Sequence, residues 1–120
     1  MTDELEDLLK RLAAATGADA GLDRLIAARL EGSDAPDPVP DYTASVDSCL
    51  GLIGRVLPGW HWHVGFGPRG IFPYATLQDS EDLFEALAPT VPLALLQAVM
   101  QAVSARGRPS HRRPPKPGGN

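Results

Sequence analysis

The apolar positions of this chain change their period once, at Pro58-Gly59. Before that joint, apolar residues recur at spacings of three and four, the period of a helix with one buried face: Val46, Cys49, Leu50, Ile53, Val56 and Leu57. After it, apolar residues alternate with small or polar ones, the period of a strand: Trp60, Trp62, Val64 and Phe66. The pattern therefore predicts a helix over about 43–57, capped by Asp41 or Thr43, and a strand over about 60–66.

Three further segments have a helical pattern. Residues 3–15 carry a leucine stripe and are followed by Gly17, and residues 20–31 carry a second stripe with Asp19 as candidate cap. The last helix follows Thr90, a capping residue, and has a proline in its first turn, where the missing N–H does no harm. Its apolar stripe consists of Leu93, Leu96, Val99, Met100 and Val103.

The predicted strand is followed by a hairpin signal. Residues 67–70 read Gly-Pro-Arg-Gly, a turn sequence, and residues 71–77 are a plausible antiparallel partner strand. Pro73 cannot donate to a sheet ladder, so we expect this second strand at a sheet edge or at a bulge. Residues 83–88 fit either one helical turn or a short third strand.

Composition limits the architecture to one modest domain. The chain has 120 residues, 43% of them hydrophobic and 22% charged, which is usual for a globular protein. The longest apolar run, residues 91–103, is interrupted by glutamines and is too short to cross a bilayer. The first residues are acidic, unlike a secretion signal, and the single cysteine fits a reducing compartment. We therefore expect a cytoplasmic protein with no membrane contact and no cofactor.

Charge is distributed unevenly along the chain. Residues 1–47 hold eleven acidic and four basic side chains, whereas residues 105–120 hold five basic and no acidic ones. The basic residues of this C-terminal end are Arg106, Arg108, Arg112, Arg113 and Lys116. Because prolines and glycines surround them, we expect residues 106–120 to be a disordered tail. The tail is a candidate contact for nucleic acid or for an acidic partner.

The order of these elements resembles a known family. The sequence DYTASVDSCLGLI, then PGWHWHV, then TVPLALLQAVMQAV is similar to the phage ABA-sandwich domains, which are small phage and prophage proteins. The resemblance covers about residues 20–105 and is carried by Tyr42, Trp60, Trp62, Thr90 and Pro92. Val91 separates Thr90 from Pro92, where the family would have them adjacent. The resemblance implies a layered α/β/α fold, favours a strand at residues 83–88 and implies no catalytic residues.

Two histidines are the main candidates for chemistry. His61 and His63 share one face of the predicted strand, about 6–7 Å apart between Cα atoms, so that both imidazoles could reach one zinc ion. A zinc site needs a third ligand, and no further residue is spaced to provide it. We therefore favour a solvent-facing role for both histidines.

The remaining candidates point to structure. Trp60 and Trp62 are expected in the core against the helices, with Trp60 the more exposed of the two, and Cys49 is expected to be a buried, inert thiol. The predicted core contains Val46, Leu50, Ile53, Trp60, Trp62, Val64, Leu93, Leu96, Val99 and Met100.

These patterns predict an α+β fold. We expect an N-terminal helix at residues 1–17, then one domain at 18–105 with a small antiparallel sheet of two or three strands packed between helices, its hairpin at about 60–77. Since no catalytic or complete metal constellation is visible, the leading hypothesis is a non-enzymatic phage or prophage accessory protein that binds a host or phage protein. The alternatives are a nucleic-acid-associated protein that uses the tail and a metal-binding domain at His61 and His63.

Overall fold

The computed structural model describes residues 2–67 and 73–106, which form an α+β fold. Its four helices are α1 (Thr2–Ala14), α2 (Ala20–Leu30), α3 (Val46–Val56) and α4 (Val91–Arg106), and a short 3₁₀ turn, η1 (Gly32–Asp34), follows α2. Its three strands are β1 (His61–Phe66), β2 (Pro73–Gln78) and β3 (Leu83–Leu87). The predicted fold class is thus confirmed.

The strands form one antiparallel sheet in the order β1-β2-β3. In β1 and β2, Trp62 lies opposite Leu77 and Val64 opposite Ala75. In β2 and β3, Leu77 lies opposite Phe84. Residues paired in this way point to the same side of a sheet, so one side is apolar throughout.

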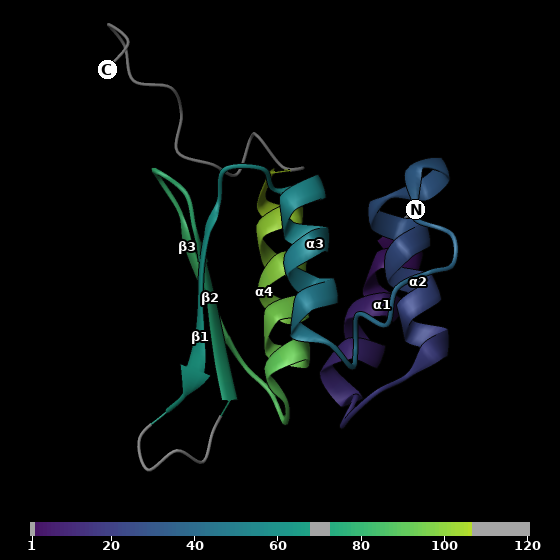
Figure 1. Cartoon of the computed structure of the whole chain (residues 1–120), viewed down its shortest axis with the longest axis horizontal. Coiled ribbons are helices and arrows are strands. Elements are labelled where there is room, and N and C mark those ends of the chain that lie inside the picture. Colours follow the sequence, from purple (N-terminus) through teal and green to yellow (C-terminus); the bar gives the residue numbers. More distant parts are fainter. Residues whose placement is uncertain (1, 68–72, 107–120) are drawn as a thin grey trace, which may run out of the picture.

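The sheet is an outer layer of the molecule. Helices α3 and α4 form the middle layer, and α1 and α2 lie beyond them on the side away from the sheet (Figure 1). The layer order therefore differs from the expected one, in which helices cover both sheet faces. The physical reason is that α1 packs against α2 and α4, so the apolar stripes of the two N-terminal helices are buried on that side of the molecule. No described helix is therefore left to cover the second face of the sheet.

Helix α4 is the centre of the core. It contacts β2 and β3 on one side and α3 and α1 on others, and a helix enclosed in this way must be apolar nearly all round. Its buried residues are Leu93, Ala94, Leu95, Leu96, Ala98, Val99, Met100 and Ala102. The predicted cap is confirmed, because Oγ1 of Thr90 accepts a hydrogen bond from the backbone N–H of Leu93 at 3.3 Å.

Of the predicted core residues, most lie in or against the core. Ile53, like the four predicted residues of α4, is buried, while Val46, Leu50, Trp60 and Val64 are partly buried against the core. Trp62 is different, since 46% of its surface is exposed, and its assignment to the core was wrong.

The sequence predicted the start of α2 correctly and the start of α3 incorrectly. Asp19 caps α2, its side chain accepting a hydrogen bond from the N–H of Leu22 at 3.0 Å. Helix α3 begins later than expected, and its cap is Ser45 instead of Asp41 or Thr43. Thr43 is engaged elsewhere, because its backbone N–H and hydroxyl both donate to Oδ1 of Asp23 in α2.

The position of β2 corrects a second expectation. Pro73 suggested an edge strand, but β2 is the central strand and Pro73 is its first residue. A proline is tolerated there because the ladder begins at that residue. Residues 83–87 form β3, which resolves the open choice between helix and strand.

Candidate interaction surface

The two faces of the sheet have different surroundings. The helix-facing side carries Trp62, Val64, Phe66, Ala75, Leu77, Phe84 and Ala86, of which Ala75, Leu77 and Ala86 are buried. The opposite side, here called the outer face, carries His61, His63, Gly65, Tyr74, Thr76, Gln78, Leu83, Glu85 and Leu87. In the described part of the chain, no helix or strand covers the outer face (Figure 1).

The most exposed large apolar side chains of the described residues are on this sheet. Leu83 and Leu87 of β3 are 61% and 62% exposed on the outer face. Trp62 and Phe66 of β1 are 46% and 59% exposed on the helix-facing side. Other exposed large hydrophobic residues, such as Leu9 and Leu25, reach only 36–37%.

The exposure of β1 follows from where α4 lies. Helix α4 makes its main contacts with β2 and β3 and few with β1. The side chains of β1 that face the helices therefore extend past the helix that would cover them. Here we call Trp62, Val64 and Phe66, with the open side of β1, the β1 edge.

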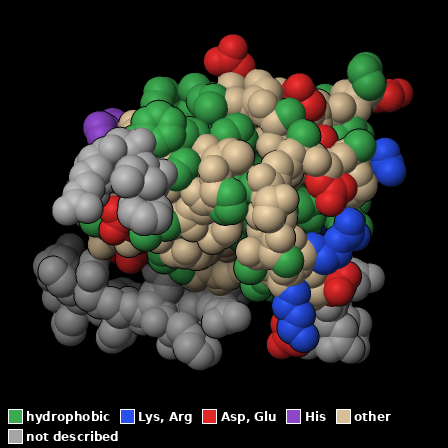
Figure 2. Space-filling view, turned by 90° about the horizontal axis from the view of Figure 1, so that it is seen from below, with side chains coloured by type: hydrophobic (Ala, Val, Ile, Leu, Met, Phe, Trp, Pro, Cys, Tyr) green, Lys and Arg blue, Asp and Glu red, His purple; other side chains and the backbone are tan. Residues whose placement is uncertain are grey.

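On the face shown in Figure 2, charged and apolar side chains gather in different regions. In Figure 2, Lys, Arg, Asp and Glu side chains lie mainly toward the side of α1 and α2, and hydrophobic ones gather beside a histidine on the sheet side. Glu85 is the one Asp, Glu, Lys or Arg among the described strand residues. A sheet with one charged residue and four exposed large apolar side chains among its described residues, two of these side chains on each face, is a candidate interaction surface.

Both histidines lie on the outer face and are exposed. Nε2 of His63 is 3.0 Å from the hydroxyl oxygen of Tyr74, and the two rings stack with centroids 5.8 Å apart. The Tyr74 ring also lies over Gly65, where an added Cβ would approach its hydroxyl to 3.2 Å. Among residues 2–67 and 73–106, no three His, Cys, Asp or Glu side chains are grouped to hold a metal ion.

The relative exposure of the two tryptophans is the reverse of the one expected. Trp60, which precedes β1, is partly buried and stacks on Phe84 of β3 with ring centroids 6.0 Å apart. Trp62 is the more exposed one. The alternating pattern predicted correctly that both point to the helix side of the sheet. It does not indicate which strands α4 covers, and α4 covers β2 and β3 more than β1.

Cys49 lies in the core. Its thiol donates to the backbone carbonyl of Tyr42 with a 3.0 Å separation. Burial, together with the negative charges of Asp23 and Asp41, raises the pKa of this thiol to about 12. The thiolate, which is the nucleophilic form, is therefore scarce at neutral pH.

Sequence reasoning missed an ion pair between the exposed Arg55 side chain and the buried carboxylate of Glu31. Nε of Arg55 lies 2.7 Å from Oε2 of Glu31, whose side chain is only 3% exposed, and the Tyr42 hydroxyl donates to the same carboxylate. Burial alone would raise the pKa of Glu31, but hydrogen bonds from Arg55 and Tyr42 and the charge of Arg55 hold it below its usual value. Glu31 and Tyr42 flank the proline-rich segment 32–40 that leads from α2 toward α3, so these contacts hold both ends of that segment against α3. Their partners are far apart in the sequence, so no local pattern announces them.

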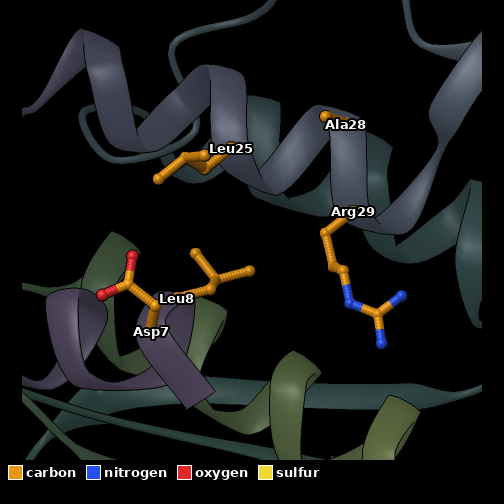
Figure 3. A pocket seen from close by; sticks show the side chains of 5 residues that line it. All are labelled: Asp7, Leu8, Leu25, Ala28 and Arg29. Carbon is orange, nitrogen blue, oxygen red and sulfur yellow. The ribbon is translucent and has the colours of Figure 1, made fainter. Parts of the chain in front are cut away.

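A separate hollow lies between α1 and α2, with a volume of about 360 Å³. Leu8 and Leu25 face each other across it, and Asp7 and Arg29 stand at its two ends (Figure 3). Ligand sites of this size usually have several polar groups that converge on the ligand. Here the two charged groups are set apart, so the hollow is a weaker candidate than the sheet.

The basic residues of the C-terminal end fall almost wholly outside the described residues. Arg106 is the last residue of α4. Arg108, Arg112, Arg113 and Lys116, and the predicted disorder of this end, lie beyond the part of the chain that the structure describes.

Comparisons with protein-family models, with curated proteins and with solved structures found no match for this chain. None of the helices in the described residues is long and apolar enough to cross a membrane.

Proposed function

We propose that this chain is a non-enzymatic protein that binds another protein on the outer face of its sheet. The observation that carries the proposal is the pair Leu83 and Leu87, each more than 60% exposed on an outer face that no described element covers. They lie four residues apart on one strand, so both point to the same side.

The energetics favour a covered state of this face. Fully burying a leucine side chain is worth roughly 1.5–3 kcal/mol, so covering the exposed parts of these two contributes roughly 2–4 kcal/mol together. His61, His63 and Tyr74 add polar and aromatic groups on the same face. Tyrosine is enriched where proteins meet, because its ring contributes area and its hydroxyl a hydrogen bond.

Two side chains of types that can perform catalysis, Cys49 and Glu31, are engaged in structure. The Cys49 thiol is buried and protonated, and the Glu31 carboxylate is neutralised by Arg55. These arrangements support a binding role over a catalytic one.

The resemblance of the sequence to phage ABA-sandwich domains supplies the context of the proposal. In that context the chain is a phage or prophage accessory protein in the host cytoplasm, and its partner is a host or phage protein. This part of the proposal rests on the sequence motifs alone.

The proposal is tested by comparing two doubly substituted proteins with the wild type. Leu83→Lys/Leu87→Lys changes the outer face, and Leu9→Lys/Leu25→Lys changes exposed leucines of α1 and α2 as a matched control. Each protein is immobilised and exposed to an extract of cells that carry the gene. We expect a protein that the wild type and the control retain and the outer-face variant loses. Equal retention by the outer-face variant, or loss in the control alone, would contradict the proposal.

A further inference from the structure

Strand β1 has one neighbour in the described sheet. It pairs with β2, and its other side is an edge. The edge of a sheet presents backbone N–H and C=O groups that can pair with another strand, and proteins usually protect such edges with charged residues or proline. The six residues of β1, His61–Phe66, contain no Asp, Glu, Lys, Arg or Pro.

The opposite edge, β3, is protected in this way. Glu85 occupies the middle of β3. If β3 paired with β3 of a second copy about its centre, the two Glu85 carboxylates would lie opposite each other, which is destabilising. Of the two edges, charge therefore favours β1 for contact with a second copy.

The side chains of β1 are arranged symmetrically for such a contact. Trp62 and Phe66 lie two residues on either side of Val64, and all three face the helix side of the sheet. When two β1 strands run antiparallel with Val64 opposite Val64 of the second copy, Trp62 falls opposite Phe66 of that copy, on the same side.

We propose that this chain forms a two-fold symmetric dimer by antiparallel pairing of β1 with β1 of a second copy, centred on Val64. The two three-stranded sheets become one continuous sheet. In this register His63 lies opposite Gly65 of the second copy, so that no histidine lies opposite the same histidine of the second copy.

The area available at this contact makes the dimer a weak one. An aromatic side chain buries about 150–250 Å², so the exposed halves of Trp62 and Phe66 contribute roughly 400 Å² across both copies. The backbone edges add to this, but the total stays in the class below about 1,200 Å², where reversible contacts are found. We therefore expect a monomer–dimer equilibrium in the micromolar range or weaker.

Dimerisation also enlarges the outer face, an argument that rests on the proposed function. Three strands about 4.8 Å apart and six residues long span roughly 14 Å by 20 Å, or roughly 300 Å². A standard interface needs about 800 Å² from each partner. A continuous sheet from two copies doubles the outer face and brings it closer to that size.

Sedimentation equilibrium of the full chain, from low micromolar to near-millimolar concentration, tests the dimer. The variants are Phe66→Lys at the β1 edge and Leu87→Lys, an equally exposed residue of β3, as the control. We expect a wild-type dimer, a dissociation constant raised about tenfold or more by Phe66→Lys, and no change with Leu87→Lys. Circular dichroism and thermal melting check that both variants fold. A wild type that is monomeric throughout, or equal weakening by both substitutions, would overturn the proposal.

The register has its own test. In an antiparallel pair, facing Cα atoms are about 4.5–5.5 Å apart, within the range of disulfides. Under mild oxidation, Val64→Cys is therefore expected to give a disulfide-linked dimer, whereas Leu87→Cys is not. No linked dimer from Val64→Cys, or linkage at equal rates in both variants, would contradict the pairing at Val64.

The two proposals fail separately. A wild type that stays monomeric but loses its partner when Leu83 and Leu87 are changed would remove the dimer and leave the proposed function standing. A wild type that dimerises but binds no partner on its outer face would remove the proposed function and leave the dimer standing. If the β1 amides of a monomeric wild type gain protection from hydrogen exchange only when another protein is added, the edge belongs to a strand of that protein and the dimer is overturned.

Discussion

Trp62 and Leu77 lie opposite each other on neighbouring strands and point to the same side of the sheet, yet Leu77 is fully buried and Trp62 is 46% exposed. The boundary of the core therefore runs between β1 and β2. The apolar side of β1 is not covered by the helices, and this is why Trp62 and Phe66 of the β1 edge are exposed.

This boundary predicts unequal costs for two truncations. Leu77→Ala removes a fully buried side chain and should lower the free energy of unfolding by about 2–5 kcal/mol. Trp62→Ala removes a larger but half-exposed side chain and should cost roughly 1–2 kcal/mol. Urea unfolding of dilute protein, where a dimer is dissociated, measures both values. A larger cost for Trp62→Ala would place Trp62 in the core after all.

The ion pair of Glu31 and Arg55 predicts an acid dependence of stability. The pKa of Glu31 is below its usual 4.5 in the folded state. Its contribution is therefore present above the unfolded pKa and is lost as the pH falls through the folded value. Between neutral pH and pH about 3, the free energy of unfolding should fall less in Glu31→Gln than in the wild type.

The matched change on the other partner is Arg55→Met, which leaves the buried carboxylate without its cation. This variant should lose about 1–3 kcal/mol at neutral pH. If Glu31→Gln and the wild type have the same acid dependence, the carboxylate is not held by the network described above.

The thiol of Cys49 predicts an absence of reactivity in the folded protein. Because its pKa is raised to about 12 by burial first of all, a disulfide reagent such as Ellman's should not react with native protein at pH about 8 and should react fully in urea. A raised pKa also means that the contribution to stability is present below the unfolded pKa of about 9 and is lost as the pH rises toward about 12. Rapid labelling of the native protein would contradict this burial.

Two glycines should respond oppositely to alanine. Gly54 lies on the exposed side of α3, and an added Cβ would meet nothing within 4 Å, so Gly54→Ala should stabilise the protein by about 0.5–1 kcal/mol. Gly59 has φ of +85° in the turn before β1, and Gly59→Ala should destabilise it by about 1 kcal/mol or more. Thermal melting of the two variants checks both signs.

Local pattern was sufficient for most of the elements. Alternation at residues 60–66 predicted β1 and the sides to which its residues point, and Thr90 and Asp19 marked two helix starts. The third helix start was misjudged because Thr43 looks like a cap but binds Asp23, twenty residues away in the chain.

The candidate surface was harder to predict than the elements. Whether Trp62 is buried depends on where α4 lies across the sheet, and whether Leu83 is covered depends on which layer the N-terminal helices join. Both depend on how elements far apart in the sequence pack together, and the local pattern of apolar and polar residues does not determine that packing.

The most direct test of the central claim, that the outer face binds another protein, is site-specific photo-cross-linking in living cells. A photoreactive phenylalanine analogue replaces Leu83 or Leu87 on the outer face, or Leu9 or Leu25 on α1 and α2. The account predicts covalent adducts with a second, different protein from the outer-face positions and none from the helix positions. Adducts from α1 and α2 with none from the outer face would contradict it.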